Sequence, residues 1–504
     1  NQISRKIDNF LTQPVINIFL QSSDKTTSLT SETLKSLTNQ HYPYWRLHVQ
    51  ISESALAQYP GFFEDKRIIV NGYEPSPSDD WGIRLQPGDL LHEMALYEIA
   101  KKIISCPDVK VIYTDHDHID PKGELKDPHL KPDWNQDLLL GSNYFGIPTI
   151  YKSEIWYKYF PEITNNHELA LLATSDLKAT EILHIPHILA SMRITDDDSH
   201  LTPATTRKSY PIPDPPPLVS VLIPTKNKGR LLERCTSSLH ELTSYSKIEL
   251  ILVDHESTET YSRKVLHSLS QKPNVKIINF SGPFNYAEMM NNAAKSAEGE
   301  ILVLLNNDTE VIEPSWLEEL VAQVSRPEVG VVGALLLFKN GTIQHAGIHP
   351  GVNSFMNHGH KHLPGNHAGY FGRLLIAHEV AAVTGACLAI KTSDWERFEG
   401  MDEKNLAVAY NDVDLCMKAR SMGKKIIFTP HAKLIHHESL TRGFDENPLK
   451  KDRLTKEIKT MQERWGDLLS SDPAHNPNLD QESSRFILND KPLNRPEWSI
   501  DWKA

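Results

Sequence analysis

From residue 219 onward, short apolar runs alternate with helical stretches, and this pattern constrains the fold more than any other feature of the chain. The apolar runs cover 219–223, 248–253, 275–280 and 300–305. A helix is predicted over 285–297, before the last run. Strict alternation of strands and helices is typical of a parallel sheet covered by helices. We therefore predict an α/β domain.

Short polar clusters stand directly after these predicted strands. They are 224–227, Asp254, 282–285 and 306–308. In parallel sheets, ligands bind beyond the carboxyl ends of the strands, where those ends meet at one edge. We expect all four clusters to lie together on that rim.

A proline-rich segment divides the chain. Between residues 202 and 218, prolines stand at positions 203, 211, 213, 215, 216 and 217. Such a stretch forms neither a helix nor an interior strand, so it is expected to act as a stiff linker. We predict a domain over 1–201, the linker over 202–217, a second domain over 218–445, and a C-terminal helix with an extended surface tail over 446–504.

The composition excludes several classes of protein. In 504 residues the formal net charge is −12 and no dense block of Lys or Arg occurs, which argues against nucleic-acid binding. No apolar run approaches the ~20 residues of a transmembrane helix, and residues 1–10 lack the pattern of a secretion signal. The four cysteines form no Cys-x-x-Cys pair, as expected for reduced thiols in a cytoplasmic protein. Because the chain is acidic as a whole, we expect any anionic ligand to bind at a local site, for example at a bound metal ion.

Asn306-Asn307-Asp308 follows the apolar run 300–305. A carboxylate there can hold a divalent cation against a diphosphate, because Mg²⁺ and Mn²⁺ prefer oxygen ligands and leave coordination positions for phosphate oxygens. An isolated motif of this kind is more often a plain turn. On these residues alone, both interpretations stay open.

An acidic motif, Asn-Asp-Val-Asp at 411–414, precedes a predicted helix. One interpretation is an N-cap whose acids are favoured by the helix dipole. Asp412 and Asp414 are two residues apart and do not share a helical face, so at most one of them reaches a given pocket. A carboxylate aimed at an acceptor hydroxyl is the general base that an inverting displacement needs.

Histidines gather in two places. His436 and His437 follow a strand-like run, and one of them could give a nitrogen ligand to the cation held by Asp308, although a structural role is the commoner one at a strand end. The zinc-protease pattern His-Glu-x-x-His is excluded, because Thr441 stands where the second histidine is required. The Gly- and His-rich stretch from His345 to Gly372 is expected to form a mobile lid.

Together these motifs resemble the family 2 glycosyltransferases of GT-A fold, and more closely the tandem-domain members of O-antigen and rhamnan-type polysaccharide synthesis. The matching stretches are Val219-Ser-Val-Leu-Ile-Pro-Thr-Lys-Asn227, Leu252-Val-Asp254, Pro283-Phe-Asn-Tyr286, Leu304-Leu-Asn-Asn-Asp308, Gln344-His-Ala-Gly347, Thr384-Gly-Ala-Cys387, Asn411-Asp-Val-Asp-Leu-Cys416 and His436-His-Glu-Ser439. They occur in the family's order across roughly 220 residues, which is more specific than any single motif. The resemblance implies two GT-A domains in tandem, each with a mostly parallel sheet.

The resemblance also implies roles for residues. Asp412 matches the catalytic base, and Asp308 and His436 match metal ligands, with His437 as the substitute for His436 and Asn306 in the place of the first acid of the Asp-x-Asp metal motif. The residues implied for donor binding are Pro224, Thr225, Asp254, Asn285, Asn292 and Asn306. The residues implied to lie near the donor sugar and the acceptor are Thr384, Gly385 and Ala386.

The implied function is that of an inverting glycosyltransferase. It would use Mn²⁺ or Mg²⁺ to transfer a sugar from a nucleotide diphosphate donor to a glycan or lipid-linked glycan acceptor. The expected setting is the cytoplasm, with peripheral association with membrane-bound assembly enzymes at the inner face of the cell membrane and no role for nucleic acid.

The first half resembles the N-terminal transferase-like domain of the same tandem proteins, but it lacks the acids of a catalytic site. The regions in question read Ile51-Ser52-Glu53-Ser54, Arg84-Leu85-Gln86-Pro87-Gly88-Asp89 and His167-Glu168-Leu169-Ala170. Asp115 and Asp117 look like a metal pair, but their position favours a structural role. We predict a degenerate domain that performs no transfer.

Two other functions remain as alternatives. A sugar-phosphate nucleotidyltransferase shares the layered sheet and the cation chemistry, but it needs a Gly-rich basic loop after the first strand, where this chain offers only Lys226 and Lys228. A catalytically weak glycan-binding scaffold would retain the fold without the activity. Loss of Asp308 or Asp412 would favour the scaffold, and both acids are present.

Overall fold

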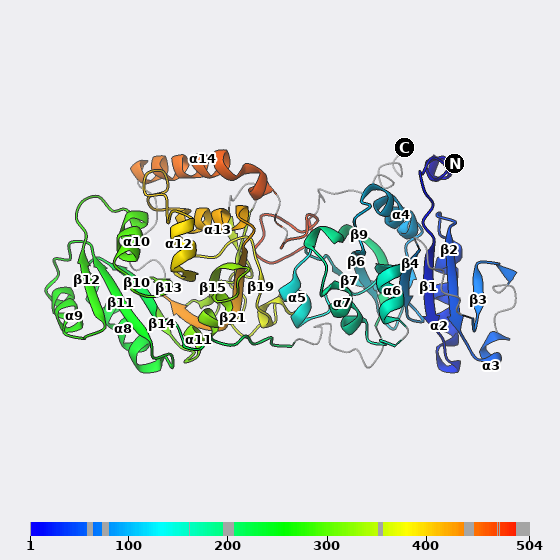
Figure 1. Ribbon diagram of the computed structural model, residues 1–504, viewed down its shortest axis with the longest axis horizontal. Coiled ribbons are helices and arrows are strands. Elements are labelled where there is room, and N and C mark those ends of the chain that lie inside the picture. Colours follow the sequence, from blue (N-terminus) through cyan, green and yellow to red (C-terminus); the bar gives the residue numbers. More distant parts are fainter. Residues whose placement is uncertain are drawn as a thin grey trace.

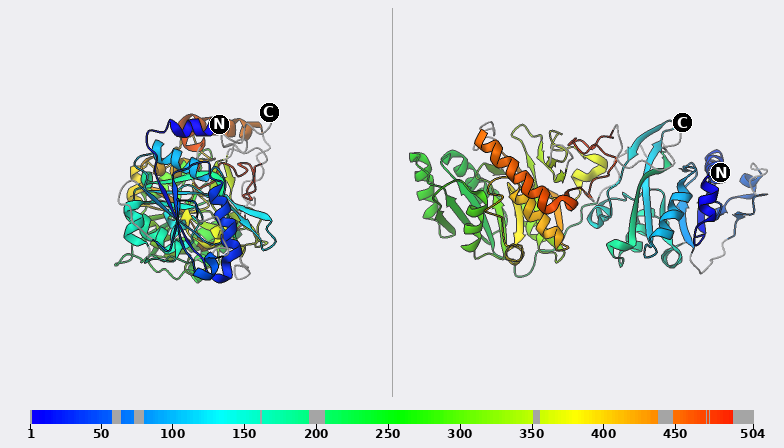
Figure 2. Two further views of the ribbon diagram at one scale, coloured as in Figure 1. Left: turned by 90° about the vertical axis from the view of Figure 1, so that its right-hand side faces the viewer. Right: turned by 90° about the horizontal axis from the view of Figure 1, so that it is seen from above.

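The computed structural model describes residues 2–57, 64–72, 80–160, 162–194, 206–350, 356–437, 448–470, 472 and 474–489. Two β-sheets lie side by side along its long axis, one from each half of the chain (Figure 1). Helices pack against both sheets, as the end-on and top views also show (Figure 2). The predicted α/β fold class is confirmed. Within these residues, none of the helices combines the length and the apolar character needed to cross a membrane.

The second half forms a sheet with the strand order β12-β11-β10-β13-β20-β15-β21-β14. Its strands are β10 (Val219–Thr225), β11 (Ile248–Asp254), β12 (Val275–Asn279), β13 (Ile301–Leu305), β14 (Thr309–Val311), β15 (Val329–Leu337), β16 (Ile343–His345), β19 (His378–Glu379), β20 (Cys387–Lys391) and β21 (Lys425–His436), with the separate hairpin β17 (Ile348–Pro350) and β18 (Met356–His358). Its helices are α8 (Gly229–Leu242), α9 (Thr260–Ser270), α10 (Tyr286–Lys295), α11 (Trp316–Val324), α12 (Thr392–Arg397), α13 (Asn411–Ser421) and α14 (Pro448–Ser470), with a 3-10 turn at Tyr370–Leu375. The strands β10 to β13 pair in parallel as predicted, whereas β14 and β20 pair antiparallel to their neighbours.

The first half forms a second sheet with the order β3-β2-β1-β4-β8-β6-β9-β5. Its strands are β1 (Ile16–Gln21), β2 (Trp45–Gln50), β3 (Ile68–Val70), β4 (Trp81–Leu85), β5 (Leu90–Leu91), β6 (Val111–Ile119), β7 (Leu125–His129), β8 (Thr149–Lys152) and β9 (Ile182–Arg193). Its helices are α1 (Gln2–Asp8), α2 (Thr27–Thr38), α3 (Glu53–Leu56), α4 (Ala95–Ser105), α5 (Gln136–Gly141), α6 (Ser153–Tyr159) and α7 (Asn166–Thr174).

The two sheets share one topology. Each strand of the first order corresponds to a strand of the second in the same sequence, from β3 and β12 at one edge to β5 and β14 at the other. The pairing directions agree as well, with β6 parallel to β9 and β15 parallel to β21. The chain is therefore a tandem of two domains of like topology. The exact domain limits stay a prediction.

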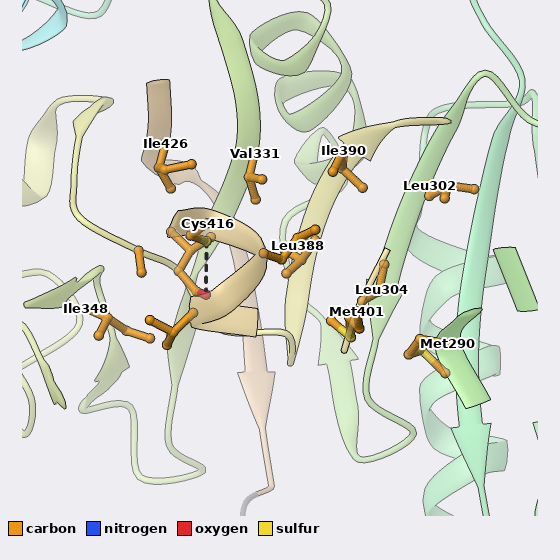
Figure 3. Packing of buried hydrophobic residues seen from close by; sticks show 14 of the residues in the cluster. Met290, Leu302, Leu304, Val331, Ile348, Leu388, Ile390, Met401, Cys416 and Ile426 are labelled. Carbon is orange, nitrogen blue, oxygen red and sulfur yellow. Dashed lines mark hydrogen bonds between the residues drawn. The ribbon is translucent and has the colours of Figure 1, made fainter. Parts of the chain in front are cut away.

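Successive side chains along the strands of the second sheet point to opposite faces, so this half has two hydrophobic cores, one on each face of the sheet. Val221 and Ile223 of β10 pack into the core on the side of α8 and α11, whereas Leu222 packs into the core with residues of α10 and α13. This follows from the two-residue repeat of a strand that is covered on both faces. Figure 3 shows the second of these cores, which includes Leu304 of β13, Leu388 of β20 and Cys416 of α13.

An ionic contact joins the two halves. The Asp137 carboxylate of α5 lies 2.7 Å from the guanidinium of Arg326 and 3.4 Å from the ammonium of Lys425. The Tyr210 hydroxyl donates to the same carboxylate at 3.3 Å, and the Tyr210 ring lies under Arg326. Asp137 and Arg326 are both buried, and each has a second ionic partner, Lys425 for Asp137 and Glu328, at 2.9 Å, for Arg326. The described part of the predicted linker, from residue 206, thus packs against both halves.

The C-terminal tail lies between the halves, whereas a surface path was predicted. Asn476 and Leu479 are each 1% exposed. The Asn476 amide donates to both oxygens of Asp115, at 3.2 and 2.9 Å, and to the Lys131 carbonyl at 2.8 Å. The prediction placed the tail on the surface because Pro and Asn are typical there, but buried carbonyls and carboxylates of the first half need donors. Asp115 therefore has a structural role, as expected.

We expect Asn476→Ala to destabilise the protein by about 1–3 kcal/mol, because it leaves buried acceptors without a donor. Urea unfolding monitored by tryptophan fluorescence would measure the change. The exposed Asn274 is the matched control, because its amide makes one long hydrogen bond of 3.3 Å to the Ile248 carbonyl. Asn274→Ala is expected to stay within about 0.5 kcal/mol of wild type. Equal stability of the two variants would show that the hydrogen bonds of Asn476 do not stabilise the protein.

Candidate functional site

A cleft of about 470 Å³ opens at the carboxyl ends of the parallel strands. It is lined by Pro224, Thr225, Lys226, Asn227, Lys228, His255, Glu259, Phe284, Tyr286, Met289, Asn306, Asn307, Asp308, Val408, Ala409 and Arg453. Three of the four polar clusters predicted to share one rim contribute to its wall, and His255 directly follows Asp254, the fourth cluster. The sequence pattern therefore located this cleft.

The loop after β10 is held by its neighbour. Asn227 and Lys228 have left-handed backbone angles, with φ of 55° and 56°. The Asn227 side-chain oxygen accepts hydrogen bonds from the backbone N–H groups of Thr258 and Glu259, at 2.8 and 2.9 Å. Asn tolerates this conformation better than most residues, which explains its place at the turn. The loop is thereby fixed at the mouth of the cleft.

Asn306 and Asp308 line the cleft, and the ring of His436, which is not itself a lining residue, contacts both of them. His436 Nε2 lies 3.1 Å from Asp308 Oδ1 and 3.3 Å from the side-chain nitrogen of Asn306. Asp308 is 3% exposed and follows β13, whereas His436 ends β21, which pairs with β14 at this point. His437 points elsewhere, with its Nε2 2.9 Å from Glu310. Of the two histidines, the structure brings His436 to Asp308.

The residues at this point fit a divalent cation that is also held by its substrate. A carboxylate oxygen and an imidazole nitrogen can both ligate Mn²⁺, and such ions in phosphate sites typically take few protein ligands. Within the described residues, no group of three or more His, Cys, Asp or Glu side chains is arranged to hold a metal ion alone. A cation here would therefore need phosphate and water oxygens to complete its coordination.

A smaller cavity of about 140 Å³ adjoins the cleft and contains Asp412. It is lined by Tyr286, Asn306, Thr384, Gly385, Ala386, Val408, Ala409, Tyr410, Asn411 and Asp412. The Gly385 N–H donates to Asp412 Oδ2 at 2.7 Å, and the Val413 N–H donates to Oδ1 at 2.9 Å. Four residues line both cavities, so a ligand in the cleft can extend toward Asp412.

The two acids of the 411–414 motif point in different directions. Asp414 is fully buried, and its carboxylate lies 2.7 Å from Arg464 and 3.2 Å from Lys418. The Trp465 indole N–H also donates to it at 2.8 Å. Asp414 thus anchors α14 to α13, while Asp412 faces the cavity. This agrees with the expectation that the two acids do not share a helical face.

Two histidines, His345 and His358, contact each other near Thr384 of the smaller cavity. His345 Nδ1 lies 2.8 Å from His358 Nδ1, and His345 Nε2 lies 3.5 Å from the Thr384 nitrogen. Burial lowers the pKa of His345 well below its usual value and lowers the pKa of His358 to about 4. The tail packs against Asn357, and the lid expected over 345–372 stays a prediction. Residues 351–355 lie outside the described part.

Residues 220–390 match the family model described as glycosyl transferase family 2. The chain contains a family 2 glycosyltransferase domain.

Two longer proteins resemble the chain, one over its whole length and one over most of it. An uncharacterized protein, y4gI, of Sinorhizobium fredii is 33% identical over 564 residues, which cover 100% of this chain and 61% of that protein. The O-antigen biosynthesis protein RfbC of Myxococcus xanthus is 33% identical over 396 residues, which cover 71% of this chain and 31% of that protein. The chain therefore spans less than two thirds of the length of these curated relatives.

A solved structure is also similar. It is a mannosyltransferase from Pyrobaculum calidifontis in complex with GDP-Man and Mn²⁺, with 20% sequence identity and a TM-score of 0.38. The match covers 52% of this chain and 72% of that chain.

Three donor-site residues expected in the glycosyltransferase domain do not line the cleft. The Asp254 carboxylate accepts a hydrogen bond from the Ser257 N–H at 3.2 Å. Asn285 caps α10 by accepting from the Glu288 N–H, and its amide donates to the Glu403 carbonyl. Asn292 lies on α10 and is half-buried, away from the lining residues. Asn285 thus has a structural role that its position before a helix could have indicated.

Arg453, which no sequence motif indicated, lines the cleft from α14. One turn later, the buried Glu457 accepts hydrogen bonds from the Val408 and Ala409 N–H groups, at 2.9 and 3.2 Å. The rim is therefore more basic than the two lysines of the first loop suggested. No local signal marks Arg453, because its place depends on how α14 docks.

The first half carries different residues at the corresponding positions. Asp89, between β4 and β5, is buried and accepts hydrogen bonds from the Gln86 and Arg193 N–H groups. Burial raises the pKa of Asp89 to about 7. Where Asp412 opens α13, the first half has His167 near the start of α7, and its ring contacts the Leu139 carbonyl. These side chains stabilise turns and helix contacts, and the loss of catalysis in the first half stays a prediction.

Proposed function

We propose that this chain is an inverting glycosyltransferase that transfers a sugar from a nucleotide diphosphate donor to a glycan or lipid-linked glycan acceptor in bacterial surface polysaccharide synthesis. The observation that carries the proposal is the continuity of two cavities. Asp308 lines the larger one and is contacted by His436, Asp412 lines the smaller one, and Tyr286, Asn306, Val408 and Ala409 line both. The name of the RfbC relative supports the biosynthetic setting.

In the proposed reaction, the nucleotide occupies the larger cleft and the donor sugar extends into the smaller cavity. Lys226, Lys228 and Arg453 offset phosphate charge at the cleft wall. Asp412, oriented by the Gly385 N–H, takes the proton of the acceptor hydroxyl as that oxygen attacks the anomeric carbon. The bond from that carbon to the diphosphate breaks on the opposite face, so the anomeric configuration inverts.

Asp308 and His436 would hold the divalent cation, Mn²⁺ or Mg²⁺. When bound, this cation supplies positive charge against the diphosphate leaving group. Asn306 replaces an acid beside it, so Asp308 is the carboxylate on which the site depends. We further propose that the first half performs no transfer and that the chain works in the cytoplasm, where it can associate with membrane-bound assembly enzymes.

Thermal-shift measurements with UDP-, dTDP- and GDP-sugars, each with Mn²⁺ or with EDTA, would test the donor and metal assignments. One donor class is expected to raise the melting temperature in Mn²⁺, because a ligand at a hundredfold excess over its Kd stabilises the folded state by about 2.7 kcal/mol. EDTA is expected to remove most of that shift. An unchanged shift in EDTA would refute the metal assignment.

Product analysis would test the reaction itself. With the donor so identified, NMR of the product is expected to show the anomeric configuration opposite to that of the donor. A retained configuration would exclude the single displacement. Donor binding without any transfer or hydrolysis would favour the glycan-binding scaffold, and release of pyrophosphate from a nucleoside triphosphate and a sugar phosphate would favour the nucleotidyltransferase.

A further inference from the structure

A buried glutamine, Gln344, stands behind the proposed metal ligand His436. It belongs to β16, which pairs with β15, and β15 in turn pairs with β21, whose last residue is His436. Gln344 is 5% exposed. Its side chain makes two contacts with one residue: Oε1 lies 2.6 Å from His436 Nδ1, and Nε2 donates to the His436 backbone carbonyl at 3.3 Å.

These two contacts determine which atom donates and which accepts in each hydrogen bond between Gln344 and His436. A backbone carbonyl accepts hydrogen bonds and does not donate them, so the NH₂ end of the Gln344 amide must face the His436 carbonyl. The amide oxygen then faces Nδ1. Since that oxygen is an acceptor, Nδ1 must carry a proton and donate it. Gln344 therefore selects the tautomer of His436 that is protonated on Nδ1.

The selected tautomer directs a lone pair to the place where the cation is proposed. With Nδ1 protonated, His436 Nε2 is the nitrogen that can bind a metal ion, and it lies 3.1 Å from Asp308 Oδ1. Two acceptor atoms at this distance repel each other unless a cation or a proton lies between them. The Asn306 amide, 3.3 Å from the same nitrogen, can donate to it when no cation is bound.

We propose that Gln344 is a positioning residue that sets the tautomer and the ring orientation of His436 and thereby tunes the affinity of the site for a divalent cation. The proposal rests on the proposed function, because it assigns Gln344 a role toward the same metal site. Hydrogen bonds from outer partners commonly fix ligating histidines in this way, and their loss typically weakens metal binding 10- to 100-fold.

The adjacent residue shows why this strand can serve the site. Successive side chains of a strand point to opposite faces. Gln344 reaches the end of β21, while His345 reaches toward Thr384, whose neighbour Gly385 holds Asp412. The short β16 therefore contacts both the metal side and the base side of the site.

Electron paramagnetic resonance titration of Mn²⁺ would test the proposal, with Mn²⁺ alone and with UDP, dTDP or GDP. Gln344→Leu is expected to weaken Mn²⁺ binding about 10- to 100-fold. Gln344→Glu keeps an acceptor for the Nδ1 proton and is expected to recover most of the affinity. Gln323→Leu is the matched control. Gln323 is a buried glutamine of α11 that forms hydrogen bonds with Glu319 of the same helix and with Arg326, which follows it, and it does not line the cleft.

The outcomes separate this proposal from the proposed function. If Asp308→Asn loses Mn²⁺ binding but Gln344→Leu, still folded by circular dichroism, binds as wild type does, the positioning role is wrong and the metal site stands. If Asp308→Asn binds Mn²⁺ as wild type does, both are wrong. Equal losses in Gln344→Leu and Gln344→Glu, with Gln323→Leu unaffected, would also overturn the tautomer argument, because the Glu variant retains the acceptor.

Discussion

Asp412→Asn is expected to lower the turnover number by about 10²- to 10⁴-fold, the usual contribution of a general base. The amide has nearly the same shape as the carboxylate, and its oxygen can still accept the 2.7 Å hydrogen bond from the Gly385 N–H. It cannot take a proton from an acceptor hydroxyl. Donor affinity, measured by calorimetry, is therefore expected to stay within about threefold of wild type, so that the loss appears in kcat.

Asp414→Asn is the matched control for this variant. Asp414 stands two residues later in the same helix, but its carboxylate binds Arg464 and Lys418 and is fully buried. Its substitution is expected to lower the melting temperature more than the turnover number, because breaking a buried ion pair costs stability. The reverse pattern, with Asp412→Asn retaining more than about a third of wild-type turnover, would move the base to another residue.

The sequence alone predicted the parallel part of the second sheet well. The strands expected at 219–223, 248–253, 275–280 and 300–305 all occur. Within the sheet this follows because strands buried on both faces form continuous apolar runs that end at polar turns, whereas β12 is a partly exposed edge strand. The same logic located the cleft, since the ends of parallel strands must meet. It also predicted that the acids of the 411–414 motif diverge, because helical geometry alone fixes their directions.

The antiparallel strands and the tail were harder to predict. The pairing of β20 with β13 joins residues 82 to 90 positions apart, and that of β21 with β14 joins residues 123 to 127 positions apart. No local periodicity specifies such neighbours. Arg453 reaches the cleft only because Glu457 and Asp414 dock α14 onto the domain. Tertiary contacts of this kind decide the role of a residue whose local sequence is ordinary.

The shared topology clarifies how the halves differ. Both sheets place a turn between the fourth strand in sequence and the short edge strand that follows. In the second half that turn presents Asp308 next to His436, whereas in the first half Asp89 accepts hydrogen bonds from its own turn and from Arg193. The first half retains the fold and contributes contacts such as Asp137 to Arg326. Its conserved topology therefore does not imply a second catalytic centre.

Asp308→Asn is expected to lower Mn²⁺-supported turnover at least about 100-fold, because loss of a residue that merely orients a ligand already costs 10- to 100-fold. Unlike Asp412→Asn, this variant is also expected to weaken donor binding in Mn²⁺, since the cation would join the carboxylate to the diphosphate. The amide keeps the size of the side chain and leaves the Asp308 backbone carbonyl, which accepts from the His437 N–H at 2.8 Å, in place. A large change in fold is therefore not expected.

The matched control for Asp308→Asn is Glu310→Gln, since Glu310 pairs with His437 on the neighbouring strand, 2.9 Å from its ring, and is absent from the cleft wall. Donor titrations in Mn²⁺ and in EDTA separate the two possible roles of Asp308. If the carboxylate acts through a cation, EDTA lowers the donor affinity of wild type to the level of Asp308→Asn. The donor affinity of Asp308→Asn itself is then the same in Mn²⁺ and in EDTA. If wild type and Asp308→Asn bind the donor equally in Mn²⁺, Asp308 holds the turn after β13 and the lysines and Arg453 alone offset the diphosphate charge.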